Sequence, residues 1–226
     1  MLRDSNRRAQ SRPLFNNLKR GSTILLIINF IETILPLFRL HCKDRRLNEE
    51  ELTQELVIIL LQNIKFEFPF RFIAEYRDIH TIGADRRRRV DIGVVPSETE
   101  KGTNSFFCIE AKCLPTLPFV KREREYVIGG NNNGGVERFK RELHGKELPE
   151  NAMIGYINSQ SFNYWFTSIN KWINDLSVSN TDSSITWKKT EELTKVRLND
   201  VSAIYKSHNI RKNDFVYIHH IWIKMN

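Results

Sequence analysis

Two carboxylates and a lysine stand where they can do chemistry together. Glu110 and Lys112 are two residues apart inside the apolar stretch Phe106–Leu114, and Asp91 lies in the apolar stretch before it. Alternate residues of a β-strand point to one face, so Glu110 and Lys112 share a face. An unpaired charge inside an apolar strand is costly, so these groups need partners or a ligand. Carboxylate oxygens suit hard cations such as Mg²⁺.

The segments that carry these residues have strand character. Asp85–Pro96 and Ser105–Leu114 are predicted as two strands joined by a hairpin through polar residues. If these strands pair, Asp91 comes alongside Glu110. We therefore predict a metal site at Asp91 and Glu110, with Lys112 beside it. A purely structural Glu–Lys pair with a nearby Asp is the alternative.

These two strands resemble the two halves of the PD-(D/E)XK motif of restriction-endonuclease-like nucleases. Arg89-Val90-Asp91-Ile92-Gly93-Val94-Val95 is similar to the first half, and Phe107-Cys108-Ile109-Glu110-Ala111-Lys112 is similar to the second. Val90 stands in place of the proline that names the motif, at a position that varies in the family. The resemblance covers roughly residues 49–157, where the predicted α-β-β-β-α-β order also matches the family core.

The resemblance implies a role for each residue. Asp91 and Glu110 would hold Mg²⁺, with the carbonyl of Ala111 completing the shell and Mn²⁺ as the alternative ion. Lys112 would orient or deprotonate the attacking water and neutralise charge on the phosphate. Neighbouring carboxylates should keep Lys112 protonated, which favours the electrostatic role. The chain is thus expected to be a metal-dependent endonuclease, a phosphodiester hydrolase acting on DNA, with RNA as the alternative substrate and restriction or phage defence as the setting.

Many members of the family carry one more glutamate, on the helix before the first strand. Here a helix is predicted from about Glu49 to Asn63, capped by Asn48. Glu49 lies on the same stripe as Leu52 and Leu56, so it is expected to face the core and join the catalytic residues. The alternative is an acidic first turn that only complements the helix dipole. The other glutamates of the helix are expected to face solvent.

Basic residues flank the predicted site and are candidates for binding nucleic-acid phosphates. Arg87 and Arg89 belong to an arginine run that leads into the second strand. Arg138 and Lys140 lie on a helix predicted after a glycine-rich run that ends at Gly135, and this helix often lines the site in the family. We expect these four residues to contact phosphates, with a solvated surface as the alternative. The glycine-rich run is expected to be a mobile loop.

Charge is distributed unevenly along the 226 residues. Of the net charge of +8, residues 1–46 contribute +7, from ten Lys/Arg and three Asp/Glu, and the rest contributes +1. A basic segment of this kind suggests a polyanionic partner, and a solvated tail is the alternative. Three cysteines without metal-type spacing fit a reducing cytoplasm.

The apolar run Ile24–Leu40 is interrupted by Asn29, Glu32 and Pro36. It is therefore expected to form a buried or dimer-forming helix and not a membrane span. A homodimer through this helix is left open, and no membrane partner is expected.

The expected fold class is α/β, a mixed central β-sheet flanked by helices around a restriction-endonuclease-like αβββαβ core. Residues 1–48 are predicted as a basic segment with one apolar helix, 49–160 as the nuclease-like core, and 161–226 as a helix and β-hairpin packed on it. The alternative function is a non-catalytic nucleic-acid-binding or oligomerising module of the same fold. The intact Asp91, Glu110 and Lys112 argue against that alternative.

Overall fold

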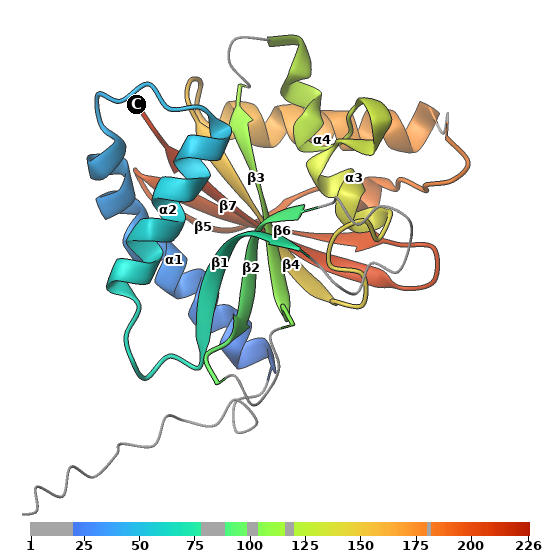
Figure 1. Ribbon diagram of the computed structural model, residues 1–226. Helices are drawn as coiled ribbons and strands as arrows, with labels where there is room; N and C mark the ends of the chain where they lie inside the picture. Colours follow the sequence, from blue (N-terminus) through green and yellow to red (C-terminus); the bar gives the residue numbers. More distant parts are fainter. Residues whose placement is uncertain (1–19, 78–88, 99–103, 116–119, 180–181) are drawn as a thin grey trace, which may run out of the picture.

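The computed structural model describes residues 20–77, 89–98, 104–115, 120–179 and 182–226. The fold is α/β, as predicted, and Figure 1 shows helices on both sides of one sheet. The helices within these ranges are α1 (Arg20–Cys42), α2 (Glu49–Asn63), α3 (Gly135–Lys140) and α4 (Phe162–Ser179). The strands are β1 (Phe70–Arg77), β2 (Arg89–Pro96), β3 (Phe107–Leu114), β4 (Glu150–Ile157), β5 (Thr194–Leu198), β6 (Ser202–Ile210) and β7 (Phe215–Lys224). The short 3₁₀ segments are η3 (Val120–Tyr126), η4 (Gly130–Asn132) and η5 (Lys189–Glu191).

The described strands form one mixed sheet in the order β1-β2-β3-β4-β7-β6-β5. β1, β2 and β3 are antiparallel neighbours, whereas β3, β4 and β7 run parallel at the centre. β6 and β5 complete the sheet in antiparallel pairs. The C-terminal hairpin therefore continues the sheet and does not pack on it, and a boundary at residue 160 would divide one continuous sheet.

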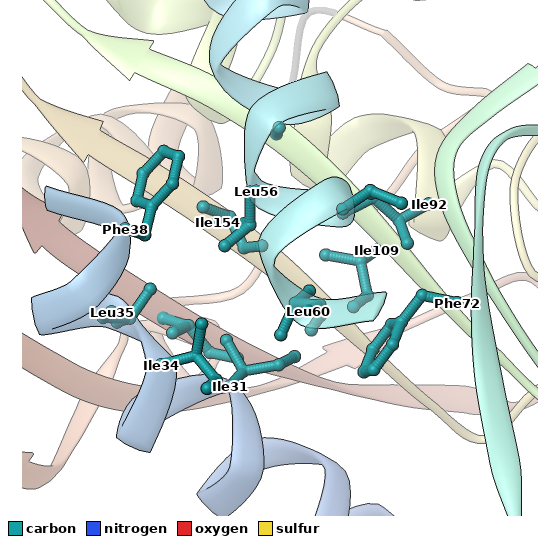
Figure 2. Close-up of a cluster of buried hydrophobic side chains, with 14 of the residues drawn as sticks. Ile31, Ile34, Leu35, Phe38, Leu56, Leu60, Phe72, Ile92, Ile109 and Ile154 are labelled. Carbon is teal, nitrogen blue, oxygen red and sulfur yellow. The ribbon is translucent and has the colours of Figure 1, made fainter. Parts of the chain in front are cut away.

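Each face of the sheet buries its own apolar cluster. On the α1 and α2 face, Leu56 and Leu60 of α2 pack with Ile92, Ile109 and other strand residues, as Figure 2 shows. On the other face, α4 buries Trp165, Ile169 and further side chains against the sheet. Successive residues of β3 point to opposite faces of the sheet, so the strand contributes to both clusters. Its odd-numbered residues belong to the first cluster. Its even-numbered positions are thereby turned to the opposite face, where Glu110 and Lys112 lie.

The long apolar helix α1 is part of the first cluster. By length and composition alone α1 passes for a membrane-spanning helix. In the folded chain it buries Ile27, Ile31, Leu35 and Phe38 against α2 and the sheet. The prediction of a buried helix is therefore confirmed, and the interrupting Glu32 is paired with Arg197 at 2.8 Å.

A buried histidine links β7 to its surroundings on the second face. His220 is fully buried, with Nδ1 2.9 Å from the hydroxyl of Tyr126 and Nε2 2.9 Å from the hydroxyl of Ser207. Burial, helped by neighbouring His219, lowers the pKa of His220 from 6.5 to about 3. Unfolding therefore exposes a group that takes up a proton at any pH between these two values.

We expect this histidine to make the fold sensitive to acid. The unfolded state binds more protons than the folded state between pH 6.5 and about 3, so the free energy of unfolding should fall as the pH drops through that window. Denaturant unfolding of His220→Gln should show a weaker pH dependence, while the exposed-site control His208→Gln should keep the wild-type dependence. An unchanged slope in His220→Gln would contradict this assignment.

Candidate functional site

The candidate site begins where β2 and β3 stop pairing. Ile92 is paired with Ile109, and the same antiparallel register carried one step further sets Asp91 opposite Glu110. At this point a side chain replaces the backbone acceptor of the strand pairing, because Asp91 Oδ2 accepts a hydrogen bond of 2.7 Å from the Ala111 N–H. The predicted convergence of these two strands is therefore what the structure contains.

The carboxyl group of Asp91 is poorly compensated. Its Oδ2 accepts from Ala111, and Oδ1 has no hydrogen-bond partner among the residues that the structure describes. Burial and, next, the negative charge of Glu110 raise the pKa of Asp91 to about 7, against the opposing effect of Lys112. Any further positive charge nearby would stabilise the ionised form of the Asp91 carboxylate.

Glu110 has the opposite electrostatic surroundings. It is fully buried, and burial alone would raise its pKa, but His144, Lys112 and Arg138 together hold the pKa well below its ordinary value. Arg138 donates directly to Oε1, and Lys112 Nζ lies 3.4 Å from the same oxygen. His144 Nδ1 lies 3.0 Å from Oε2 without the alignment of a hydrogen bond. Glu110 is thus ionised, with two cations, Lys112 and Arg138, and the imidazole of His144 around it.

Lys112 joins the two strands to α2. Its ammonium donates to Oε1 of Glu49 at 3.0 Å and to the carbonyl of Ala111 at 2.9 Å. Burial opposes the charged form, but Glu110, Glu49 and Asp91 together raise the pKa of Lys112 above its usual range. Lys112 is therefore a fixed positive charge at neutral pH, which agrees with the electrostatic role expected from the sequence and makes it a poor base.

The first turn of α2 positions Glu49 beside Lys112. Asn48 caps the helix as predicted: its side chain accepts from the Glu51 N–H, and the Glu51 carboxylate accepts from the Asn48 N–H. With the helix start set in this way, Oε2 of Glu49 also accepts from the Cys113 N–H at 2.7 Å. Of the acidic residues in this turn, Glu49 is the one that contacts the β3 residues, as the stripe analysis predicts. Glu55 instead pairs with His41 and Arg45.

Arg138 reaches the site from the other face of the sheet. It lies on α3, which follows the glycine-rich run and is shorter than the predicted helix. A Cβ at Gly134 would come within 2.3 Å of Ile128 backbone, and one at Gly135 within 2.2 Å of Met153. These two glycines therefore let the chain lie close against its neighbours. Gly134 and Gly135 at the end of the run are buried and packed, whereas residues 130–133 are exposed.

A pocket of about 410 Å³ opens over these groups. Asp91, Lys112, Glu49 and Arg138 line it. Across from Asp91, the strand β1 is irregular: Glu75 adopts a left-handed backbone with φ of 47° and also lines the pocket. A non-glycine residue held in this conformation is strained, and such strain is typical of functional sites.

The four predicted phosphate contacts have different outcomes. Arg138 and Arg89 both line the pocket, and Arg89 forms an ion pair with Glu75. Arg87 lies outside the described residues. For Lys140 the prediction is wrong, because its ammonium is buried between the two carboxylate oxygens of Glu191, at 2.7 and 2.6 Å. It is unavailable to a nucleic acid.

Sequence reasoning missed His144 as a partner of Glu110. A histidine before Gly145 is ordinarily read as a helix cap. Here α3 ends earlier, at Lys140, and His144 is buried edge-on against Phe139, beside Glu110. Gly145 has a φ of 56° at the sharp turn here, and the presence of a glycine at this position was the signal available in the sequence that the chain turns.

The oxygens of this site have the chemistry to bind a hard divalent cation, although Lys112 and Arg138 already donate hydrogen bonds to some of them. Among the described residues, no three His, Cys, Asp or Glu side chains converge as a ready-made metal centre. Of the predicted ligands, Asp91 Oδ1 has no hydrogen-bond partner among the described residues, whereas the carbonyl of Ala111 accepts from Lys112 and the carboxylate of Glu110 accepts from Arg138. Two carboxylates, one of them with a raised pKa, fit Mg²⁺ in donor type.

Comparison with known proteins yields no relative. No protein-family model, no curated protein and no solved structure matches this chain.

Proposed function

We propose that this chain is a metal-dependent nuclease that hydrolyses phosphodiester bonds of DNA on a restriction-endonuclease-like core. The observation that carries the proposal is that Glu49, Asp91, Lys112 and Arg138 line one pocket, with the buried Glu110 in contact with Lys112 and Arg138 behind it. They come from α2, β2, β3 and α3, and so from both faces of the sheet. A cytoplasmic setting such as restriction or phage defence belongs to the same proposal.

Each residue has a task that follows from its surroundings. Asp91 and Glu110 would hold Mg²⁺ or Mn²⁺, which supplies positive charge opposite the scissile phosphate. Lys112, kept protonated by its three carboxylate neighbours, stabilises negative charge as it develops on the phosphate oxygens. Glu49 holds the ammonium of Lys112 in place. Arg89 lines the pocket and would contact a neighbouring phosphate by exchanging its ion pair with the exposed Glu75.

One observation favours a second candidate, a nucleic-acid-binding module without catalysis. Glu110 is fully buried and already compensated by Arg138, Lys112 and His144, as in a structural ion-pair network. Against this stands Asp91, which lines the pocket and whose pKa is raised by burial and by the charge of Glu110 in spite of Lys112 and the Ala111 N–H. A site used only for structure would gain nothing from that arrangement.

A cleavage assay separates the two candidates. The full chain is incubated with supercoiled plasmid, linear duplex and single-stranded RNA, in Mg²⁺, in Mn²⁺ and in EDTA. We expect nicking or cutting of DNA with either metal and none in EDTA. Binding of DNA with no cleavage of any substrate in either metal would reject the nuclease and leave the binding module.

The contact between Glu49 and Lys112 yields a sharper prediction. Glu49→Gln keeps the size of the side chain and an oxygen for the Cys113 N–H but removes the charge that holds Lys112. Cleavage should fall by about 10–100-fold, the range for one hydrogen bond to a charged group. Glu55→Gln, on the same helix but paired with His41 and Arg45, is the control and should lose far less. Equal rates for wild type and Glu49→Gln would remove Glu49 from the site.

A further inference from the structure

Arg138 holds a position that the proposed reaction requires to be free. Its guanidinium donates to Oε1 of Glu110 and, at 3.3 Å, to Oδ1 of Asn133 in the loop before α3. The side chain is 23% exposed, whereas Glu110 is completely buried. Arg138 is therefore the solvent-facing partner of the buried carboxylate, and it lines the pocket from which any ligand must approach.

The charges of the site show what the departure of Arg138 would leave. With Glu49, Asp91 and Glu110 ionised and His144 neutral, the three negative charges face two positive ones, on Lys112 and Arg138. Without Arg138 the balance is three against one, a net of −2. That is the charge of one divalent cation with opposite sign, and Lys112 remains held by Glu49.

We infer that Arg138 is a displaceable latch on Glu110, which closes the site in the free protein and exchanges this carboxylate for a phosphate of the substrate when a divalent cation binds. The inference rests on the proposed function and adds a positioning residue to it. Two features make the exchange feasible. The other two partners of Glu110, the ammonium of Lys112 and the imidazole of His144, stay in place, and the pocket gives the released guanidinium room to meet a phosphate.

The latch makes cation binding competitive with an arginine of the same chain. In the free protein, a cation must break the contact between Arg138 and Glu110 before it binds, and this lowers the observed cation affinity. Removing the guanidinium removes that cost, so a variant without it should bind cations more tightly even in the absence of nucleic acid. A substrate phosphate should have the same effect in the wild type, because it offers the guanidinium another partner.

The test is a calorimetric titration of the full chain with Mn²⁺ alone, without nucleic acid. Arg138→Gln should raise the affinity by about 10–100-fold, the range for the loss of one hydrogen bond to a charged group. Asn133→Ala, which removes the second support of Arg138 without touching Glu110, should raise it by a smaller factor. Arg122→Gln is the matched control, because Arg122 lines the same pocket but pairs with Glu125.

The outcomes are separable from those of the cleavage assay. Tighter Mn²⁺ binding in Arg138→Gln but not in Arg122→Gln supports the latch, whether or not the wild type cuts DNA. Equal gains in both variants would mean that any positive charge at the pocket has this effect, which overturns the latch. Unchanged or weaker binding in both Arg138→Gln and Asn133→Ala, or no binding in any variant, overturns it as well.

Discussion

Asp91→Asn and Lys112→Met are each expected to abolish metal-dependent cleavage, but for different reasons. Asn keeps an oxygen for the Ala111 N–H and removes the charge, so Mg²⁺ affinity should fall together with the rate. Met removes the positive charge and leaves the carboxylates, so Mg²⁺ binding should persist or strengthen while the rate falls. Loss of one preorganised electrostatic contributor typically costs about 10²–10³-fold in rate. A cleavage assay beside a calorimetric Mg²⁺ titration measures both quantities.

Matched controls lie on α4, among residues that do not line the pocket. Lys171 and Asp175 form an exposed ion pair on α4 at 2.7 Å, so Lys171→Met and Asp175→Asn make the same chemical changes away from the pocket. Both controls should cut at the wild-type rate. If Lys112→Met cuts as well as wild type, the role assigned to Lys112 is wrong even if the metal site survives. If Asp91→Asn keeps its Mg²⁺ affinity, Asp91 is not a ligand.

Lys140→Met is expected to lower the free energy of unfolding more than any of the other single substitutions proposed above. The variant leaves the carboxylate of Glu191 completely buried, with the Ile210 N–H at 2.8 Å as a remaining donor. Breaking a buried ion pair from one side costs about 3–5 kcal/mol, because an uncompensated charge stays behind. Denaturant unfolding monitored by tryptophan fluorescence measures the loss.

A second variant distinguishes the charge from the packing. Lys140→Met combined with Glu191→Leu removes both charges and should recover most of the lost stability, since a buried pair is often replaceable by apolar side chains. Lys189→Met, an exposed lysine near Glu191 in the chain, should stay within about 0.5 kcal/mol of wild type. A Lys140→Met protein as stable as wild type would show that this pair does not form.

Local periodicity accounts for the part of the site that the sequence predicts. The alternation of β3 is enough to set Glu110 and Lys112 on one face, and the hairpin register is enough to bring Asp91 to them. The helical stripe selects Glu49 in the same way. These predictions succeed because each concerns residues in one element or in two paired neighbours.

The errors concern partners that are distant along the chain. The burial of Lys140 depends on Glu191, 51 residues away, and the contact of His144 with Glu110 spans two elements. β5 was not predicted, although Lys195–Leu198 alternates charged and apolar residues; the segment is short and every residue of Thr194–Leu198 is exposed, so burial gives it little signal. Helix-face and strand-face arguments carry no information on such contacts.

The strand order has a consequence for how the chain folds as it is synthesised. β7 lies at the centre of the sheet between β4 and β6, yet it follows every other strand along the chain. Until residues 215–224 are available, β4 has an unpaired edge of buried, apolar residues, and α1 lacks part of its packing surface. All residues of the candidate site are then already synthesised, but the sheet that supports them is incomplete. Pairing of β4 with β7 therefore makes folding depend on a contact that forms late, and a nascent chain halted before β7 is exposed to aggregation.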